Sequence, residues 1–151
     1  MADSGAPSGP VHRVIYRSHS LIPAGERKAA LAAIFSEARS KNKQAGITGA
    51  LLITDHYFAQ ALEGDEAAVT ALYERISKDE RHDRVTLMES GGEDVRVFSR
   101  WAMAQVSASG HADIPLHAAE GGIHASAPAP VTREQSAVLK IMRNAIGADT
   151  V

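Results

Sequence analysis

The sequence predicts an α+β fold: a ferredoxin-like βαββαββ domain with a mixed five-stranded sheet, two helices on one face and a C-terminal helical extension. Two observations support this prediction. Short β-rich runs and two longer amphipathic segments follow one another in that order. The length of 151 residues, with 44% hydrophobic and 23% charged residues, suits one globular domain with a substantial core.

The five expected strands are short and rich in β-branched or alternating apolar residues. Asp55 and His56 lie between the second and third strands and are typical of a tight hairpin turn. The sequence GGED at 91–94 is expected to turn between the last two strands. The expected strands are residues 12–18, 50–54, 57–62, 85–90 and 101–106.

The two helices of the core are predicted from apolar residues at helical spacing. The first runs from Glu26 to about Ser40, and the sequence AGITG at 45–49 ends it. The second spans roughly residues 66–78 and begins after the turn that follows Leu62. Both helices are expected to lie on one face of the sheet.

The remaining segments differ in composition from this core. Residues 1–11 are small and rich in Gly and Pro, as in a disordered leader. Residues 107–131 are low in large apolar side chains and are expected to be a linker with at most short structure. Thr132 and Gln135 form a capping box that opens an amphipathic helix, 132–147. Its apolar stripe needs a surface, either the back of the sheet or a partner chain.

Charge and composition exclude several classes of protein. The formal net charge of −2 argues against a nucleic-acid or anionic-membrane binder. The absence of cysteine excludes disulfides, thiolate catalysis and cysteine metal sites. No run approaches the ~18 apolar residues of a membrane span, and the N-terminus lacks the pattern of a secretion signal. We therefore expect a cytoplasmic protein.

Gln60 is the residue that first indicates a function. Strand alternation places it between Phe58 and Leu62 on a face built for burial, where an unpartnered amide costs roughly 1–3 kcal/mol. Tyr16 and Asn42 are expected to converge on the same inner layer. Each also has a simpler structural interpretation: Asn42 as a helix C-cap, Tyr16 as a core residue and Gln60 as an amide bonded to backbone.

Five motifs surround these residues in a distinctive order. They are IYRS at 15–18, N-x-x-x-G-I-T-G at 42–49, F-x-Q-x-L-E-G at 58–64, D-x-R-H at 79–82 and F-x-x-W-x-M at 98–103. Their order and spacing resemble those of the BLUF family, the sensors of blue light using FAD, over residues 12–106. The resemblance implies a photosensory domain in which FAD lies between the two core helices, over the inner face of the sheet.

The resemblance also implies roles for individual residues. Tyr16 corresponds to the photoactive tyrosine and Gln60 to the glutamine that joins it to the flavin. Trp101 and Met103 correspond to residues of the fifth strand that relay the signal, and Lys41 stands where many members carry Asn or His. The implied cofactor-binding residues are Tyr16, Ile34, Lys41, Asn42, Phe58, Gln60, Ile76, Asp79, Arg81 and His82.

The residue types suit this chemistry. A Tyr hydroxyl can supply an electron and a proton to an excited flavin, and a Gln side chain can reverse its hydrogen bonding by rotation or tautomerisation. No cyclase domain fits beside the photosensory core. We therefore expect a non-enzymatic light switch that signals through a homo-oligomer or a separate effector protein.

Other functions stay open on the sequence alone. Arg17 and Asn42 could imitate the residue pair of small acyl-phosphate hydrolases, which share this fold, although the loop at 21–26 is a poor anion cradle. A light-independent flavin-binding or interaction module is another alternative. Three of the seven histidines lie in the segment 107–131, but without cysteines or paired carboxylates they predict no metal site.

Overall fold

The computed structural model describes residues 10–99, 101–105, 114–119, 122–125 and 132–146. The strands are β1 (Val11–Ser20), β2 (Thr48–Ile53), β3 (Tyr57–Gly64), β4 (His82–Glu93), β5 (Trp101–Gln105), β6 (Ile114–Ala119) and β7 (Gly122–Ala125). The helices are the 3₁₀ turn η1 (Ala24–Glu26), α1 (Arg27–Glu37), the π-helical turn η2 (Ala38–Asn42), α2 (Lys43–Ala45), α3 (Glu66–Ser77) and α4 (Arg133–Ala145).

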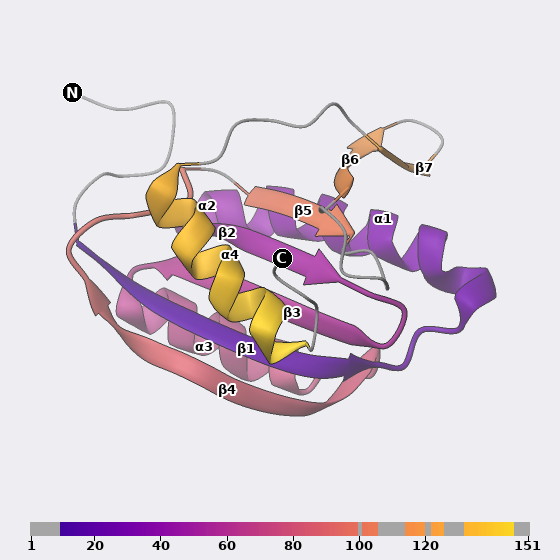
Figure 1. Ribbon diagram of the computed structural model, residues 1–151, viewed down its shortest axis with the longest axis horizontal. Helices are drawn as coiled ribbons and strands as arrows, with labels where there is room; N and C mark the ends of the chain where they lie inside the picture. The colour runs from indigo at the N-terminus through magenta and orange to yellow at the C-terminus, as the bar shows by residue number, and fades with distance from the viewer. Residues whose placement is uncertain (1–9, 100, 106–113, 120–121, 126–131, 147–151) are drawn as a thin grey trace.

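These elements form a three-layer α+β arrangement. The strands make one sheet in the order β4-β1-β3-β2-β5-β6-β7, in which β2 and β5 are parallel and the other neighbours antiparallel. Helices α1 and α3 cover one face, and α4 crosses the opposite face (Figure 1). The prediction of an α+β fold with two helices on one face is confirmed.

The sheet differs from the prediction of five strands at its far edge. β6 and β7 fall in the segment expected to be a linker, and β6 pairs with β5. These strands escaped the sequence pattern because the segment is poor in large apolar residues, whereas the pairing uses backbone groups. Of the expected disordered leader, residues 1–11, the structure describes only residues 10 and 11. Val11 is already the first residue of β1, and residues 1–9 lie outside the described ranges.

The predicted turn at GGED is wrong. β4 runs on to Glu93, and its Gly91 and Gly92 stand opposite Arg13 and His12 of β1. The ten-residue β1 pairs with β4 from His82 to Glu93, with two register shifts, and the pairing at Gly91 and Gly92 offsets the weak strand preference of glycine.

The first core helix extends beyond the predicted end at Ser40. The chain continues helically through η2 and α2 to Ala45, and Gly46 then adopts a left-handed conformation with φ of 72°. Asn42 therefore lies inside a widened turn of the helix and is not its C-cap, which corrects the simpler structural interpretation of this residue. Wide π-helical turns of this kind are frequent at functional sites.

The face under α4 has one continuous apolar cluster. Ile15, Leu52 and Ala59 from the strands meet Val138 and Met142 from α4, and all five side chains are buried. Arg17 on β1 donates a hydrogen bond from Nη1 to the carbonyl oxygen of Ala145, at 3.0 Å. The apolar stripe of α4 is thus covered by the back of the sheet of the same chain, the first of the two predicted surfaces.

The predicted capping box of α4 is present. The hydroxyl of Thr132 accepts from the backbone N–H of Gln135 at 3.0 Å, and the Gln135 side chain accepts from the backbone N–H of Thr132 at 3.1 Å.

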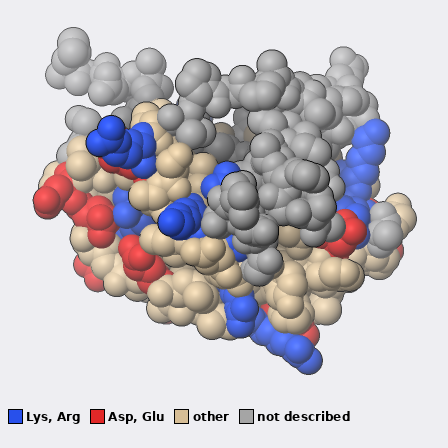
Figure 2. Space-filling model, viewed as in Figure 1, with Lys and Arg blue, Asp and Glu red and all other residues tan. Residues whose placement is uncertain are grey.

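On the outer surface, charges of both signs are interspersed over the visible described residues (Figure 2). No helix in the described ranges has the length and hydropathy needed to cross a membrane.

Candidate functional site

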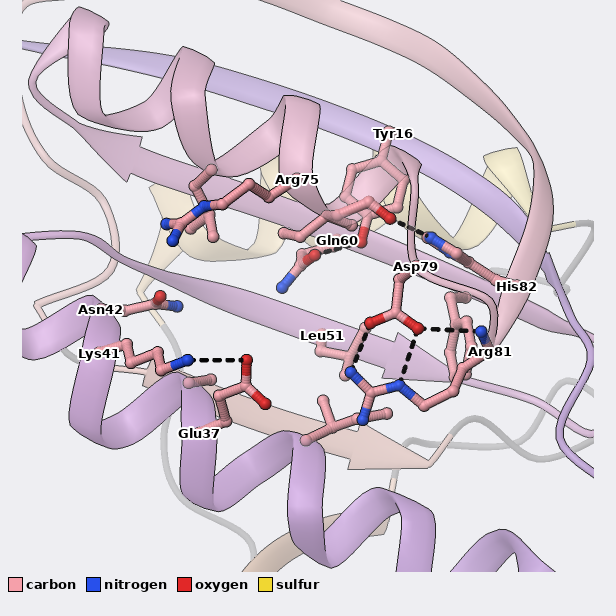
Figure 3. Close-up of a pocket in the computed structure, with 15 residues that line it drawn as sticks. Tyr16, Glu37, Lys41, Asn42, Leu51, Gln60, Arg75, Asp79, Arg81 and His82 are labelled. Atoms are coloured by element: carbon pink, nitrogen blue, oxygen red, sulfur yellow. Dashed lines mark hydrogen bonds and ion pairs between the residues drawn. The ribbon is translucent and has the colours of Figure 1, made fainter.

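A pocket of about 230 Å³ opens between α1 and α3 on the face of the sheet that these helices cover (Figure 3). It separates the two apolar clusters of that face. Ile34, Leu51 and Phe58 belong to the cluster under α1, and Leu72 and Ile76 to the cluster under α3. The polar and charged lining consists of Tyr16, Glu37, Lys41, Asn42, Gln60, Arg75, Asp79, Arg81 and His82.

Tyr16 and Gln60 lie side by side at the base of this pocket. They stand opposite each other on β1 and β3, and both are almost fully buried. The Tyr16 hydroxyl donates a hydrogen bond to Oε1 of Gln60, and the amide nitrogen of Gln60 points away from it into the pocket (Figure 3). The predicted partner of Gln60 is therefore a side chain from the neighbouring strand and not the backbone.

Burial controls the protonation of Tyr16. Removal from water raises the pKa of its hydroxyl well above the ordinary value, and the nearby Tyr73 and Asp79 raise it further. The rings of Tyr16 and Tyr73 lie 5.6 Å apart between centroids. Tyr16 is therefore neutral near pH 7 and is available as a hydrogen-bond donor to Gln60.

The turn η2 carries Lys41 and Asn42 to the mouth of the pocket. The Asn42 side chain is buried and faces the pocket, whereas the exposed Lys41 forms an ion pair of 3.5 Å with Glu37 one turn earlier (Figure 3). The backbone carbonyl of Asn42 accepts a hydrogen bond from Ile47 N at 2.8 Å, which fixes the end of the turn.

The opposite end of the pocket is formed by residues 79–82. The Asp79 carboxylate accepts from Nε of Arg81 at 2.9 Å and from Nη2 at 2.5 Å. These bonds from Arg81 hold the pKa of Asp79 below its ordinary value. Because the carbonyl oxygen of Ile76 only accepts, His82 donates to it from Nε2 at 2.6 Å, and its Nδ1 forms a hydrogen bond of 2.7 Å with the hydroxyl of Ser18.

The two residues predicted to relay a signal lie beside the pocket. Trp101 packs on both apolar clusters, but it is not among the residues that line the pocket. In the described ranges its indole N–H is the buried side-chain group that lacks a hydrogen-bond partner. The backbone of Met103 stands opposite Leu51 on β2; its side chain lies outside the described part of the chain.

All ten predicted cofactor-binding residues line this one pocket. Sequence reasoning missed Glu37, Ala38, Leu51, Leu72 and Arg75 as lining residues. Helical spacing could have indicated three of them, since Glu37 and Ala38 follow Ile34 by three and four positions and Leu72 precedes Ile76 by four.

The structure separates the residues of the predicted hydrolase pair. Arg17 reaches α4 on the back of the sheet, whereas Asn42 faces the pocket between the helices. Their side chains therefore do not form one anion site. Among the described residues, no group of three or more His, Asp or Glu side chains is placed to hold a metal ion.

The BLUF family model, described as sensors of blue-light using FAD, matches residues 11–104. The chain belongs to the BLUF family. It is 40% identical over 78 residues to the photoactivated adenylate cyclase subunit beta of Euglena gracilis, a match that covers 51% of this chain and 9% of that protein. It is 33% identical over 90 residues to the blue light- and temperature-regulated antirepressor BluF of Escherichia coli, covering 60% of this chain and 22% of that protein.

Solved BLUF proteins share the fold. The ground-state structure of BlsA matches with a TM-score of 0.59 and 34% identity, over 64% of each chain. The dark-state structure of BlrB matches with a TM-score of 0.58 and 30% identity, over 65% of this chain and 73% of that one. The chain spans about a tenth of the length of the cyclase subunits it matches, so the shared part is the BLUF domain.

Proposed function

We propose that this chain is a blue-light photoreceptor that binds FAD non-covalently in the pocket between α1 and α3. The pocket would sit on a ferredoxin-like unit made of β1, α1, β2, β3, α3 and β4 and extended by β5. One observation carries the proposal: in a chain of the BLUF family, the hydrogen-bonded pair Tyr16 and Gln60 lies buried at the base of an apolar-walled pocket. The bound flavin would supply light absorption and electron acceptance.

The lining suits a flavin in shape and in chemistry. Pockets that enclose a whole drug-sized ligand have volumes of about 300–1,000 Å³, so a cavity of about 230 Å³ has room for a ring system and leaves the rest of a dinucleotide at the mouth. Ile34 and Ile76 offer apolar surface from opposite helices. The side-chain amides of Asn42 and Gln60 carry both donors and acceptors. They can therefore hydrogen-bond to the edge of a flavin ring, which has carbonyl oxygens and an N–H.

The switch in this proposal is the hydrogen bond between Tyr16 and Gln60. A tyrosine that gives up an electron and its proton stops donating to Oε1 of Gln60. Gln60 can then exchange its donor and acceptor ends by rotation or tautomerisation, and the dark arrangement is lost. The buried setting supports this role, because a hydrogen bond is electrostatically stronger inside a protein than in water.

We further propose that β5 carries the change toward a partner. Gln60 stands opposite Leu51 on β2, and Leu51 stands opposite Met103 on β5. Trp101, two residues earlier, packs on the clusters that flank the pocket. The output would be a contact with a second copy or a separate effector, and any catalysis in the cyclase relatives would belong to parts of those proteins outside the match.

The experiment must distinguish FAD from FMN as the bound flavin, because a structure of the BLUF protein BlrP1 contains FMN. Purified protein should be titrated with FAD and with FMN, and its absorption spectrum recorded in the dark and under blue light. We expect tighter binding of FAD and a reversible shift to longer wavelength. Protein that stays colourless with both flavins contradicts the proposal, and a bound flavin without a light response favours a light-independent flavin-binding module.

Tyr16→Phe is the matched variant for this measurement. Its ring still packs against Tyr73, so flavin binding should persist. Its spectrum should show no light-induced shift, because the group that donates to Gln60 is absent.

A further inference from the structure

The segment between β4 and β5 is fastened to three elements at residues 97 and 98. The backbone N–H groups of Val97 and Phe98 donate to Oε1 of Glu63 on β3, at 3.0 and 2.7 Å. The carbonyl oxygen of Phe98 accepts from Thr48 Oγ1 on β2 at 2.5 Å. The carbonyl oxygen of Val97 accepts from Nε2 of Gln135, in the first turn of α4, at 3.1 Å.

Glu63 holds the centre of this arrangement. Its side chain is fully buried, and its carboxylate also accepts from Nε and Nη2 of Arg13 at 3.0 and 2.7 Å. A carboxylate removed from water persists only when it is paired and hydrogen-bonded. The position of the carboxylate and the positions of the two amides are therefore tied to each other.

The strand that carries Glu63 also carries Gln60. Arg13, Glu63 and Thr48 stand opposite one another on β1, β3 and β2. Tyr16, Gln60 and Leu51 form a second row three positions along the same strands. A step of three residues along a strand covers roughly 10 Å, and side chains three positions apart point to opposite faces of the sheet. The side chains of the two rows therefore lie on opposite faces of one short piece of sheet.

We propose that Glu63 is a positioning residue that couples the Gln60 strand to α4 through the backbone of Val97 and Phe98. The route does not pass through Trp101 or Met103, so it is a second output path, on the back of the sheet. This inference rests on the proposed photoreceptor function. A displacement of β3 at Gln60 moves the Glu63 carboxylate, the two amides follow it, and Gln135 transmits the movement to the start of α4.

Phe98 adds a packing contact to the same path. Its side chain is buried in the apolar cluster that holds Val138 and Met142 of α4. A shift of residues 97 and 98 therefore acts on α4 through one hydrogen bond and one apolar contact. Hydrogen exchange at the backbone amides of residues 97 and 98 and of α4 can therefore report such a shift.

Three variants isolate the path. Glu63→Gln keeps the shape of the side chain but removes the negative charge that holds Arg13 and the two amides. Glu93→Gln is the matched control, because Glu93 is the other carboxylate on Arg13, at 3.2 Å, whereas the amides of residues 97 and 98 donate to Glu63. Gln135→Glu preserves the capping box with Thr132 but cannot donate to the Val97 carbonyl.

The experiment measures amide hydrogen exchange of residues 97, 98 and 138–142 in the dark and under blue light, with the flavin absorption spectrum recorded on the same sample. In the unmodified protein, light should change exchange at both places. Glu63→Gln should raise dark exchange at 97 and 98 by about tenfold, retain the spectral shift and abolish the light response of α4. Gln135→Glu should keep the response at 97 and 98 but weaken the α4 response, because the apolar contact of Phe98 with α4 remains, and Glu93→Gln should behave as unmodified protein.

Two results overturn the coupling while the photoreceptor function stands: a normal spectral shift with no change of α4 exchange, or a full α4 response in Gln135→Glu. The Gln135→Glu measurement can be made even if Glu63→Gln fails to fold, because Gln135 is only partly buried and its replacement should not prevent folding. An unmodified protein that shows no spectral shift overturns the photoreceptor function, and the coupling with it.

Discussion

The two faces of the sheet are built from the same three strands, β1, β3 and β2, yet one face is closed and the other is open. Under α4, Ile15, Ala59 and Met142 belong to a single apolar cluster, and none of them is exposed to solvent. Under α1 and α3 the apolar residues form two clusters with a pocket between them. Alternation along the strands allows one face to stabilise the domain while the other keeps a pocket for the flavin that we propose.

The buried polar groups differ between the faces in the same way. On the back, the Glu63 carboxylate is fully bonded to Arg13 and to two backbone amides. In the pocket, the Gln60 carbonyl is bonded to Tyr16, while its amide nitrogen faces the cavity. A saturated network holds one arrangement, whereas an amide with a free end can adopt two.

The largest effect on stability should come from the closed face. Met142→Ala removes a side chain with no solvent exposure from the cluster under α4, and should lower the free energy of unfolding by about 2–5 kcal/mol. The neighbouring Ile141 is 38% exposed, so Ile141→Ala should cost less than about 1 kcal/mol. Urea unfolding measures both, and equal losses would show that α4 is not packed on the sheet as described.

The helix caps give a smaller and more selective comparison. Asp65 caps α3 by accepting from the N–H groups of Ala67 and Ala68, and Thr132 caps α4. Replacing either residue by Ala should lower the free energy of unfolding by about 1 kcal/mol. Only Asp65→Ala should also weaken flavin binding in a titration, because α3 forms a wall of the pocket. Equal weakening by both variants would contradict the assignment of functions to the two faces.

The smallest effect concerns pH. Arg81 holds the pKa of Asp79 below its ordinary value, so the contribution of this carboxylate to stability is present above about pH 4 and is lost as the pH falls through the lowered value. Because the pair is partly exposed, the loss should be about 1 kcal/mol or less. Asp79→Asn should therefore show a smaller fall in unfolding free energy between pH 5 and pH 2, estimated from urea curves.

Strong periodicity explains what the sequence could predict. Both core helices, the hairpin around Asp55 and the capped helix at Thr132 carry local signals, and each was found within a few residues of its predicted place. Most of the predicted pocket residues came from the motifs of the family resemblance, which lie on β1 and β3, in the turn η2 and in the segment after α3. Local signals of this kind are sufficient to identify the elements and the residues that face inward.

The remaining features depend on partners distant in the sequence. β6 and β7 are held by pairing with β5 and with each other, and β4 continues through Gly91 because β1 lies beside it. The hydrogen bonds of Glu63 to Val97 and Phe98 join residues 34 and 35 positions apart. Periodicity within one segment carries no information about such contacts, so they could not be predicted from it.

The central claim is that the Tyr16–Gln60 pair in the open face is the light switch, and the light-minus-dark absorption difference spectrum of Gln60→Leu tests it most directly. Leucine is close to glutamine in volume, so the variant should still fold and bind flavin. It has no donor or acceptor to exchange, so we predict a flavin spectrum with no reversible shift. A full light-induced shift in Gln60→Leu would contradict the account and leave Gln60 as a buried structural amide.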